Sequence, residues 1–363
     1  MGGIETHLET LCMQLRCRFD VQVIVSNDRH DAQRDVRAGI PVTRLATPFS
    51  ITSAPVSPSL SVAVNASGAD LVHVHLPHPA AVLGLLASRY RGPLVVTYHS
   101  DVVRQRLMSA LFHPLLHLLL GRASAILVTS PNYLATSPVL AAHRPRCRVI
   151  PYGISLERFG ASLDPRVPAL RARFGPRFVL AVGRLVYYKG FDVLLRAMAA
   201  VDGRLVLIGD GPLRGALEAR VAESGLRDKV VFLGELQNED AAPYFEAADV
   251  FVLPSIARSE AFGIVQLEAM ACGTPVVNTR LDSGVPWVSQ DGQTGLTVPV
   301  GDPDALAAAI NRVLSDAALG ARLGAGGRAR VQEEFGDVRM GDRVAAVYQE
   351  VLAACGAPAE ALS

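Results

Sequence analysis

Short apolar runs rich in β-branched residues alternate with segments of helical period along most of the chain. In the first half, such runs occupy residues 21–26, 69–75, 92–99, 123–130 and 146–153. In the second half, they begin with RFVLAVGRL (177–185) and continue as RLVLIGDG, KVVFLGEL, DVFVLPS, TPVVNTR and TGLTVPV. Runs of this length are typical of buried parallel strands, and their alternation with helices predicts doubly wound α/β sheets.

The two halves are separated by a segment without a strand pattern. ISLERFGASLDPRVPALRARFGPR contains three prolines and two glycines, so we place a linker near residues 155–175. We expect a Rossmann-like domain over 1–160, a second over 161–336, and a final helix over 337–363 that folds back across the first domain. Ligands of open α/β sheets bind beyond the carboxyl ends of the strands, so two facing sheets would form a deep cleft.

Composition agrees with two buried cores and argues against some partners. The chain has 363 residues, of which 50% are hydrophobic and 19% charged. Because 35 basic residues balance 34 acidic ones, the global charge gives no reason to expect nucleic-acid binding. The five cysteines are scattered without a C-x-x-C pair, which is typical of reduced thiols in a cytoplasmic protein.

One apolar stretch has two interpretations. MSALFHPLLHLLLG (108–121) is uncharged, but it is interrupted by Pro114 and is shorter than the roughly 18 residues of a membrane span. A buried helix is one interpretation, and a surface that touches the inner face of the membrane is the other. The polar start MGGIET shows no signal-peptide pattern.

The chain opens on a glycine pair followed by an amphipathic helix. Gly2 and Gly3 allow close backbone approach, and the helix behind them would favour an anion. Phosphate-binding glycines normally follow a buried strand, and here only Met1 precedes them.

Two cations lie in GRLVYYKG, which follows a predicted strand. Arg184 and Lys189, with Gly183 at the start of the turn, would hold a diphosphate there. The alternative is a solvated basic turn.

SEAFGIVQLEAMACGTPVV carries Glu260 and Glu268. If both were on one helix, eight residues would separate them by about 12 Å, which suits two parts of one extended ligand better than one reacting centre. The backbone of Phe262, Gly263 and Ile264 would open the helix towards an anion. The alternative is an amphipathic helix with two exposed glutamates.

Histidines mark a third group of candidates. His99 follows a buried strand, where it would assist a proton transfer or bind a sugar hydroxyl. His73 and His75 share one face of another predicted strand, and His78 follows. Only Asp70 is near enough in sequence to help complete a metal shell, so we predict no metal site there.

Taken in order, GGIETH, GRLVYYKG, IGDGP, ADVFVLPS and EAFGIVQLEAMACGTPVV resemble the retaining family 4 glycosyltransferases, whose GT-B fold has two Rossmann-like domains. The resemblance covers essentially the whole chain, and the stretch with the two glutamates is its specific part. VTYHSDVVRQ and IARSEAFGIVQLE further resemble bacterial mannosyltransferases of O-antigen and exopolysaccharide assembly.

This resemblance implies roles for the candidate residues. Glu260 would contact the donor sugar and Glu268 the ribose, while the backbone of 262–264 contacts the donor. Arg184 and Lys189 would stabilise the departing diphosphate, which Gly3 approaches. His99 would lie near the acceptor and the anomeric carbon.

The implied reaction moves a hexose from a nucleotide sugar, GDP-mannose first and UDP-sugars next, to a saccharide or lipid-linked acceptor with retention of configuration. We expect no metal or other cofactor, because the two cations supply the charge and no D-x-D pair is placed to hold a metal. Family members carry a strand and a loop before the glycine pair, so we expect the first sheet to lack that strand. The simplest interpretation is a misplaced start codon or a truncated sequence. If the chain is as written, donor and acceptor binding at Gly2 and Gly3 is in doubt.

Two other classes remain open from the residues. A nucleotide-sugar 2-epimerase has the same two-domain fold but needs acidic and histidine groups poised for proton abstraction. A non-catalytic relative of the fold is favoured by the absent strand and disfavoured by the intact glutamates and cations.

Overall fold

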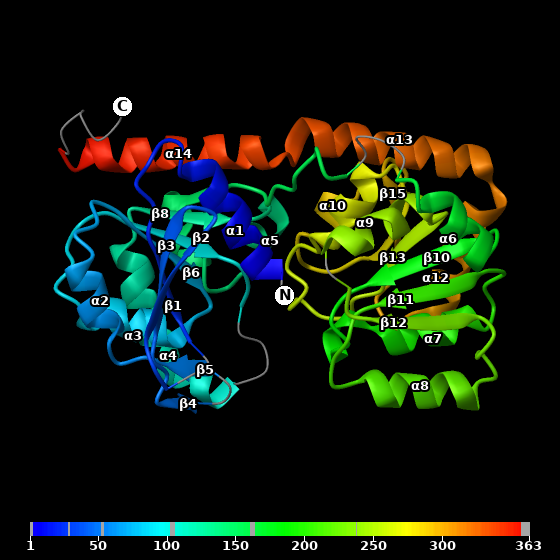
Figure 1. The fold of residues 1–363 in the computed structure, drawn as a ribbon, viewed down its shortest axis with the longest axis horizontal. Coiled ribbons are helices and arrows are strands. Elements are labelled where there is room, and N and C mark those ends of the chain that lie inside the picture. Colours follow the sequence, from blue (N-terminus) through cyan, green and yellow to red (C-terminus); the bar gives the residue numbers. More distant parts are fainter. Residues whose placement is uncertain are drawn as a thin grey trace. The chain divides into compact units, whose positions relative to one another are not determined.

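The computed structural model describes residues 3–27, 30–51, 54–101, 106–159, 164–236 and 238–356. The chain divides into two compact units (Figure 1). Unit 1 consists of Met1–Gly153 with Asp337–Ser363, and unit 2 consists of Ile154–Gly336.

Unit 2 contains one continuous six-stranded sheet in the order β12-β11-β10-β13-β14-β15, with every neighbouring pair parallel. The strands are β10 (Phe178–Val182), β11 (Arg204–Ile208), β12 (Val230–Gly234), β13 (Val250–Leu253), β14 (Val276–Thr279) and β15 (Gly295–Val298). From β10, successive strands are added on one side out to β12, and from β13 they are added on the other side out to β15. The chain therefore reverses its direction across the sheet between β10 and β13. Such a switch point is where open α/β sheets bind ligands.

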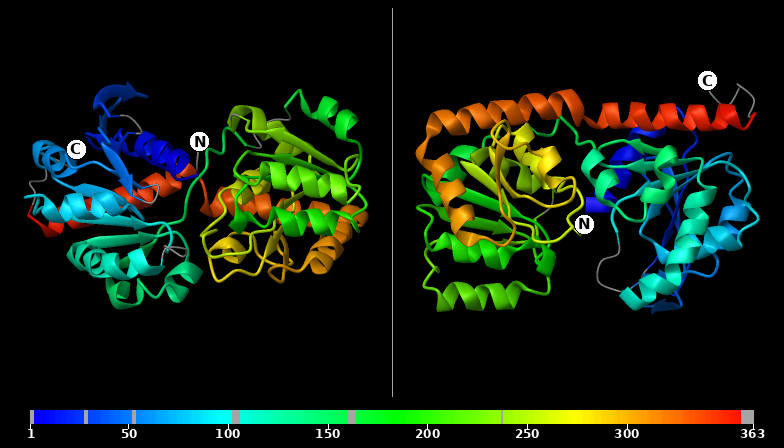
Figure 2. Two further views of the ribbon diagram at one scale, coloured as in Figure 1. Left: turned by 90° about the horizontal axis from the view of Figure 1, so that it is seen from below. Right: turned by 180° about the vertical axis from the view of Figure 1, so that it is seen from behind.

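Helices cover both faces of this sheet (Figure 2). The unit contains α6 (Val167–Phe174), η2 (Tyr187–Lys189), α7 (Phe191–Met198), α8 (Arg214–Glu223), α9 (Asn238–Ala247), α10 (Val265–Ala271), α11 (Val285–Val288), α12 (Pro303–Ser315) and α13 (Ala317–Glu334). Helix α7 contacts α8 and α12, while α9 contacts α6 and α10. The strands are buried on both faces, which explains their continuous apolar runs.

Unit 1 is built from smaller sheets. A parallel sheet has the order β6-β7-β8-β9, a second has the order β1-β3-β2, and β4 pairs with β5. The strands are β1 (Val23–Ser26), β2 (Gln33–Arg37), β3 (Ile40–Leu45), β4 (Phe49–Ile51), β5 (Ala54–Val56), β6 (Val72–Leu76), β7 (Leu94–Tyr98), β8 (Ala125–Val128) and β9 (Cys147–Val149). Among the described strands, β1 pairs only with β3 and β6 only with β7.

The helices of unit 1 include the first and the last helix of the described chain. They are α1 (Gly3–Leu15), α2 (Leu60–Ala66), α3 (Pro79–Ala87), α4 (Arg106–Arg122), α5 (Pro131–Thr136), η1 (Ala141–Arg146) and α14 (Asp337–Ala354). Helix α14 packs along α1, and both contribute to one core with β7 and β8. Leu11 and Leu15 supply the buried face of α1, as its helical period predicts.

All eleven strands predicted from apolar runs are present as β1 and β6–β15. Strands β2–β5 were missed: β2 is a largely exposed antiparallel strand of sequence QRDVR, so it lacks the apolar run of a buried strand. The segment expected to be a linker contains α6, whose Pro168 lies in the first turn and whose Gly175 ends the helix. Here the apparent helix breakers mark helix ends.

Helix α4 corrects the interpretation of the apolar stretch, because Pro114 lies inside the helix and does not end it. Leu119 is fully buried, whereas the side chain of Leu118 is 61% exposed. None of the helices in the described ranges is both long and apolar enough to span a bilayer.

Candidate active site

Two loops meet backbone to backbone at the carboxyl ends of β10 and β11. A Cβ atom on Gly209 would lie 2.0 Å from the carbonyl oxygen of Gly183, and one on Gly211 would lie 2.6 Å from that of Leu185. Both glycines also have positive φ angles, of 138° and 158°. The backbone of the IGDGP stretch therefore packs directly against the loop that carries Arg184 and Lys189.

Lys189 and Glu260 form an ion pair at this edge of the sheet. Lys189 Nζ lies 2.6 Å from Glu260 Oε2, and the two side chains are only 11% and 9% exposed. Ser255, which follows β13, donates its hydroxyl to the same carboxylate oxygen at 2.9 Å. Burial lowers the pKa of Lys189, but Glu260 and Tyr188 together outweigh burial, and the pKa lies above its usual value. The pair joins two loops that are distant in sequence.

Arg184 lies on the same loop but is exposed, and its side chain makes no ion pair within the described part of the chain. The loop thus presents one paired, buried cation and one exposed cation. Gly183, which precedes Arg184, has φ of 154°, and a Cβ there would sit 3.4 Å from Lys189 Cε. The structure brings the candidate residues Gly183, Lys189 and Glu260 together.

Residues 260–264 form a turn before α10 and are not part of it. Helix α10 begins at Val265, so Glu260 precedes the helix and Glu268 lies within it. The expected helical rise between the two glutamates was therefore wrong. Gly263 takes φ of 74°, which redirects the chain into the helix. Phe262 is buried against Trp287 and Phe335, with ring centroids 6.4 and 6.1 Å away.

Glu268 is ionisable in the physiological range in this setting. Burial raises its pKa to about 7, although the Arg158 guanidinium acts in the opposite direction. Arg158 has two buried nitrogens, Nε and one Nη, without hydrogen-bond partners. Arg158 lies in a segment with the composition of a linker, so no sequence pattern singled it out.

His99 lies in unit 1 at the carboxyl end of β7, and it is only 3% exposed. Its Nε2 lies 2.9 Å from Nδ1 of His75, and its Nδ1 is hydrogen-bonded to the hydroxyl of Tyr152. Both ring nitrogens therefore have protein partners. For His99 to act on a substrate, one of these two hydrogen bonds has to open.

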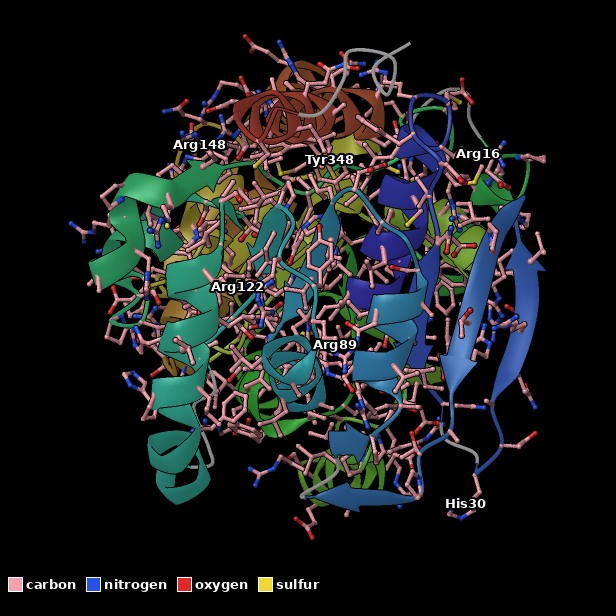
Figure 3. All side chains as sticks on the ribbon, turned by 90° about the vertical axis from the view of Figure 1, so that its left-hand side faces the viewer. Arg16, His30, Arg89, Arg122, Arg148 and Tyr348 are labelled. Carbon is pink, nitrogen blue, oxygen red and sulfur yellow. The ribbon has the colours of Figure 1, made fainter. Side chains whose placement is uncertain are left out.

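His99 belongs to a group of four buried or partly buried imidazoles, which we call the histidine cluster: His7, His73, His75 and His99. His73 connects Tyr348 of α14, at 2.6 Å, with Thr97 of β7, at 2.7 Å. Figure 3 labels Tyr348 on this helix. His78, which follows them in the sequence, caps α3 by accepting the N–H of Ala81.

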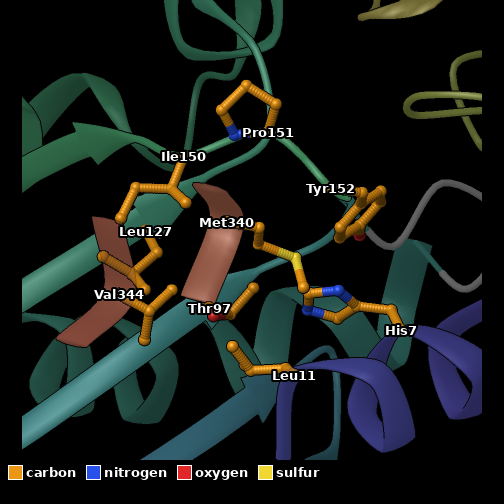
Figure 4. Close-up of a pocket in the computed structure, with 9 residues that line it drawn as sticks. All are labelled: His7, Leu11, Thr97, Leu127, Ile150, Pro151, Tyr152, Met340 and Val344. Atoms are coloured by element: carbon orange, nitrogen blue, oxygen red, sulfur yellow. The ribbon is translucent and has the colours of Figure 1, made fainter. Parts of the chain in front are cut away.

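His7 is the exception within the histidine cluster. It is 5% exposed, and neither ring nitrogen has a hydrogen-bond partner. Its ring borders a cavity of about 10 Å³ that is also lined by Thr97, Tyr152 and Met340 (Figure 4). This volume is near the lower limit for one water molecule.

The histidine cluster is held neutral. Burial lowers the pKa of His99 to about 4 and of His73 to about 3, and it lowers those of His7 and His75 well below the usual value. The described residues contain no group of three or more acidic, histidine or cysteine side chains arranged to hold a metal ion. Gly3 is the first residue of α1, and Gly2 lies outside the described residues.

Comparison with known proteins decides the family. Residues 1–158 match the family described as Glycosyltransferase Family 4, and residues 168–330 match Glycosyl transferases group 1. The D-rhamnosyltransferase WbpZ of Pseudomonas aeruginosa is 37% identical over 270 residues, which cover 74% of this chain and 71% of that protein. The chain belongs to the family 4, group 1 glycosyltransferases. A second relative of this glycosyltransferase is the O-antigen chain mannosyltransferase C of Escherichia coli, 34% identical over 78% of this chain and 76% of its own.

Solved structures confirm the GT-B fold for this glycosyltransferase. Sucrose-phosphate synthase of Thermosynechococcus elongatus superposes with a TM-score of 0.83 at 28% identity, covering 98% of this chain and 94% of that one. HepE of Anabaena, in complex with UDP-glucose, superposes with a TM-score of 0.77 at 23% identity over 96% of each chain. The predicted family and fold are therefore confirmed, and the enzyme is a glycosyltransferase.

Proposed function

We propose that this glycosyltransferase moves a hexose, with retention of configuration, from a nucleotide sugar to a growing saccharide or a lipid-linked acceptor in cell-surface polysaccharide synthesis. GDP-mannose is the proposed donor. The proposal is supported by two relatives whose names specify a mannosyltransferase, one acting on O-antigen chains and one dependent on GDP-mannose in Mycolicibacterium smegmatis, the latter 29% identical. The D-rhamnosyltransferase and the UDP-glucose complex of HepE make other sugar nucleotides the alternatives.

The observation that carries the reaction type is the buried pair of Lys189 and Glu260 at the switch point of the unit 2 sheet. Cleavage of a sugar–phosphate bond places negative charge on the departing diphosphate. A cation already fixed in a partly dry site stabilises that charge without reorganising in the transition state. Lys189 and the exposed Arg184 are proposed to supply it, with Gly183 allowing close approach of the diphosphate.

The remaining donor contacts follow along the 260–268 segment. Glu260 is proposed to bind hydroxyls of the transferred sugar while Lys189 turns to the diphosphate. The backbone of Phe262, Gly263 and Ile264 is proposed to contact the donor, and Glu268 the ribose hydroxyls. Glu268 binds hydroxyls best as a carboxylate, so we expect donor affinity to rise as the pH passes through about 7.

The acceptor is proposed to bind to unit 1 near His99. Because both nitrogens of His99 are occupied by Tyr152 and His75, this role requires one of those bonds to open. Gly2 and Gly3 are proposed to approach the diphosphate. No metal or cofactor is proposed to take part.

A peripheral contact with anionic lipids is proposed for α4 and η1. Leu118 is exposed on α4, and η1 carries the exposed Arg144 and Arg146. Arg146 donates to the carbonyl of Gly121 at 2.6 Å, so the basic segment packs against the end of α4. Figure 3 shows Arg122 and Arg148 on the same side of the unit.

Liposome flotation tests the contact with Leu118→Glu, and Val36→Glu is the matched control because Val36 is 69% exposed on β2. We expect vesicles containing anionic lipid to retain the parent and the control but to lose the Leu118 variant. Equal flotation of all three proteins would refute the membrane contact.

Donor turnover tests the proposed reaction. We would incubate the enzyme separately with GDP-mannose, UDP-glucose and UDP-GlcNAc and measure nucleoside diphosphate release with and without a saccharide acceptor, in buffer and in EDTA. The proposal expects release from GDP-mannose that increases with acceptor and is insensitive to EDTA. Release only from a UDP-sugar would show that the donor is that UDP-sugar and not GDP-mannose. Loss of activity in EDTA would refute the metal-free reaction.

A further inference from the structure

A chain of buried amides lies directly beneath the turn at 260–264. Gln266 on α10 and Asn278 on β14 are both 0% exposed. Gln266 Nε2 donates to the carbonyl of Phe262 at 3.0 Å, and Gln266 Oε1 accepts from Asn278 Nδ2 at 2.8 Å. Thr297 on β15 donates to Asn278 Oδ1 at 2.8 Å. The chain of bonds therefore runs from the edge of the sheet to the turn.

The same amides attach the turn to α11. Gln266 Nε2 also lies 3.4 Å from the carbonyl of Val285, and Asn278 Nδ2 lies 3.2 Å from that oxygen. Independently, the N–H of Gly284 donates to the carbonyl of Ala261 at 2.8 Å. The turn is thus held from two sides by hydrogen bonds that involve no charged group.

The position of Gln266 also explains the glycine above it. A Cβ atom on Gly263 would lie 2.8 Å from Gln266 Nε2 and 2.6 Å from Leu253 Cδ2. The amide therefore fills the space under the turn. Within the described part of the chain, no hydrogen bond uses the N–H groups of Gly263 and Ile264.

We propose that Gln266 and Asn278 are positioning residues for donor binding: they fix the carbonyl of Phe262, and through it the backbone of 262–264, in the orientation that receives the nucleotide sugar. This inference rests on the proposed function of the turn. It assigns the two amides no contact with the substrate.

The energetics favour a role in orientation. Each amide group of the pair has a partner, and a fully satisfied buried network specifies one geometry. Removing the Gln266 amide leaves the carbonyl of Phe262 without this side-chain donor, so one of the two attachments of the turn is lost. Because amides do not titrate, the effect on donor binding must be independent of pH, in contrast to that of Glu268.

Isothermal titration with GDP-mannose and UDP-glucose tests the inference on Gln266→Met, which keeps the volume but removes the amide. The control is Thr274→Val, which removes a buried hydrogen bond from Thr274 Oγ1 to the carbonyl of Phe245, 2.5 Å long and away from the turn. We expect about tenfold weaker donor binding by Gln266→Met at every pH, and unchanged binding by Thr274→Val, although both lose thermal stability.

A double-mutant cycle with Asn278→Leu completes the experiment. We expect the two substitutions to weaken donor binding by less than the product of their separate effects, because they break one chain of bonds. Parent-like affinity in folded Gln266→Met would overturn the inference and leave the proposed function intact. A parent that binds none of the sugar nucleotides would overturn both.

Discussion

The two units differ in how they bury ionisable side chains at the ends of parallel strands. In unit 2, the cation of Lys189 is buried beside the carboxylate of Glu260, and the two form an ion pair. In unit 1, His99 and its neighbours are buried with no carboxylate partner among the described residues, and burial lowers the pKa of each. A buried charge persists where it is paired, and otherwise the group becomes neutral.

This contrast extends to the pH dependence of stability. Histidines with lowered pKa destabilise the folded state in acid, where the unfolded chain binds the protons. Glu268 with its raised pKa has the opposite effect, because the unfolded chain loses its proton first as the pH rises. Between about pH 4.5 and 6.5, the two units are thus expected to respond to pH in opposite directions.

Breaking the ion pair is expected to have the largest effect. Lys189→Met leaves the Glu260 carboxylate buried without a cation, which is expected to lower the free energy of unfolding by about 3–5 kcal/mol and turnover by about 10²–10³-fold. Denaturant unfolding and initial rates measure the two effects. In Lys189→Met/Glu260→Gln, most of the stability should return but turnover should not. Recovery of both stability and turnover would show that Lys189 has no role in catalysis.

Acid is expected to destabilise unit 1 selectively. The stabilising contribution of neutral His99 is complete above pH 6.5 and is lost as the pH falls towards its folded pKa of about 4, a change of about 3 kcal/mol. Hydrogen exchange of peptides from β6 and β7 at a series of pH values measures it. His99→Asn should flatten the dependence. Protection that stays constant between pH 6.5 and 4.5 would contradict a buried neutral cluster.

In unit 2, Glu268 is expected to make stability fall as the pH rises, which is opposite to the effect of His99 in unit 1. Its folded pKa of about 7 lies above the usual 4.5, so up to about 3 kcal/mol of stability is lost as the pH rises between these values and none beyond. Glu268→Gln should gain stability relative to the parent over this interval, as measured by exchange of α10 peptides. A parent and variant with parallel pH profiles would show that the carboxyl is solvated.

The smallest effect is expected from weakening the attachment of α14 to the histidine cluster. Tyr348→Phe removes the hydroxyl 2.6 Å from His73 Nδ1, with an expected loss of about 1 kcal/mol in denaturant unfolding. Tyr244→Phe is the control, because no hydrogen bond of the Tyr244 hydroxyl is found among the described residues, and its effect should stay within about 0.5 kcal/mol. Equal losses would mean that the His73 contact contributes nothing.

The sequence predicted the continuous sheet of unit 2 better than the sheets of unit 1. Strands such as β10 and β13 are buried on both faces, so their apolar runs are unambiguous. Strand β2 is mostly exposed and pairs antiparallel with β3, so its residues QRDVR carry no such signal. The pattern of an exposed strand depends on a partner that the local sequence does not specify.

In the candidate site too, local motifs could be predicted from the sequence, whereas contacts between distant elements could not. GRLVYYKG and the E-x₇-E stretch singled out Lys189 and Glu260 as candidates, and family resemblance supplied their proposed roles. Nothing local indicated that Gln266 would bond to Asn278, or that both nitrogens of His99 would be occupied by His75 and Tyr152. These contacts join residues from different elements, and only the folded chain brings them together.

Hydrogen exchange of the whole enzyme with and without saturating GDP-mannose tests the central claim most directly, with UDP-glucose in a parallel series. If the donor binds at the ends of β10 and β13, peptides covering 183–190 and 255–268 become protected, and Lys189→Met abolishes that protection. Protection confined to other segments, or unchanged protection in the variant, would contradict the claim that the Lys189–Glu260 pair forms the donor site.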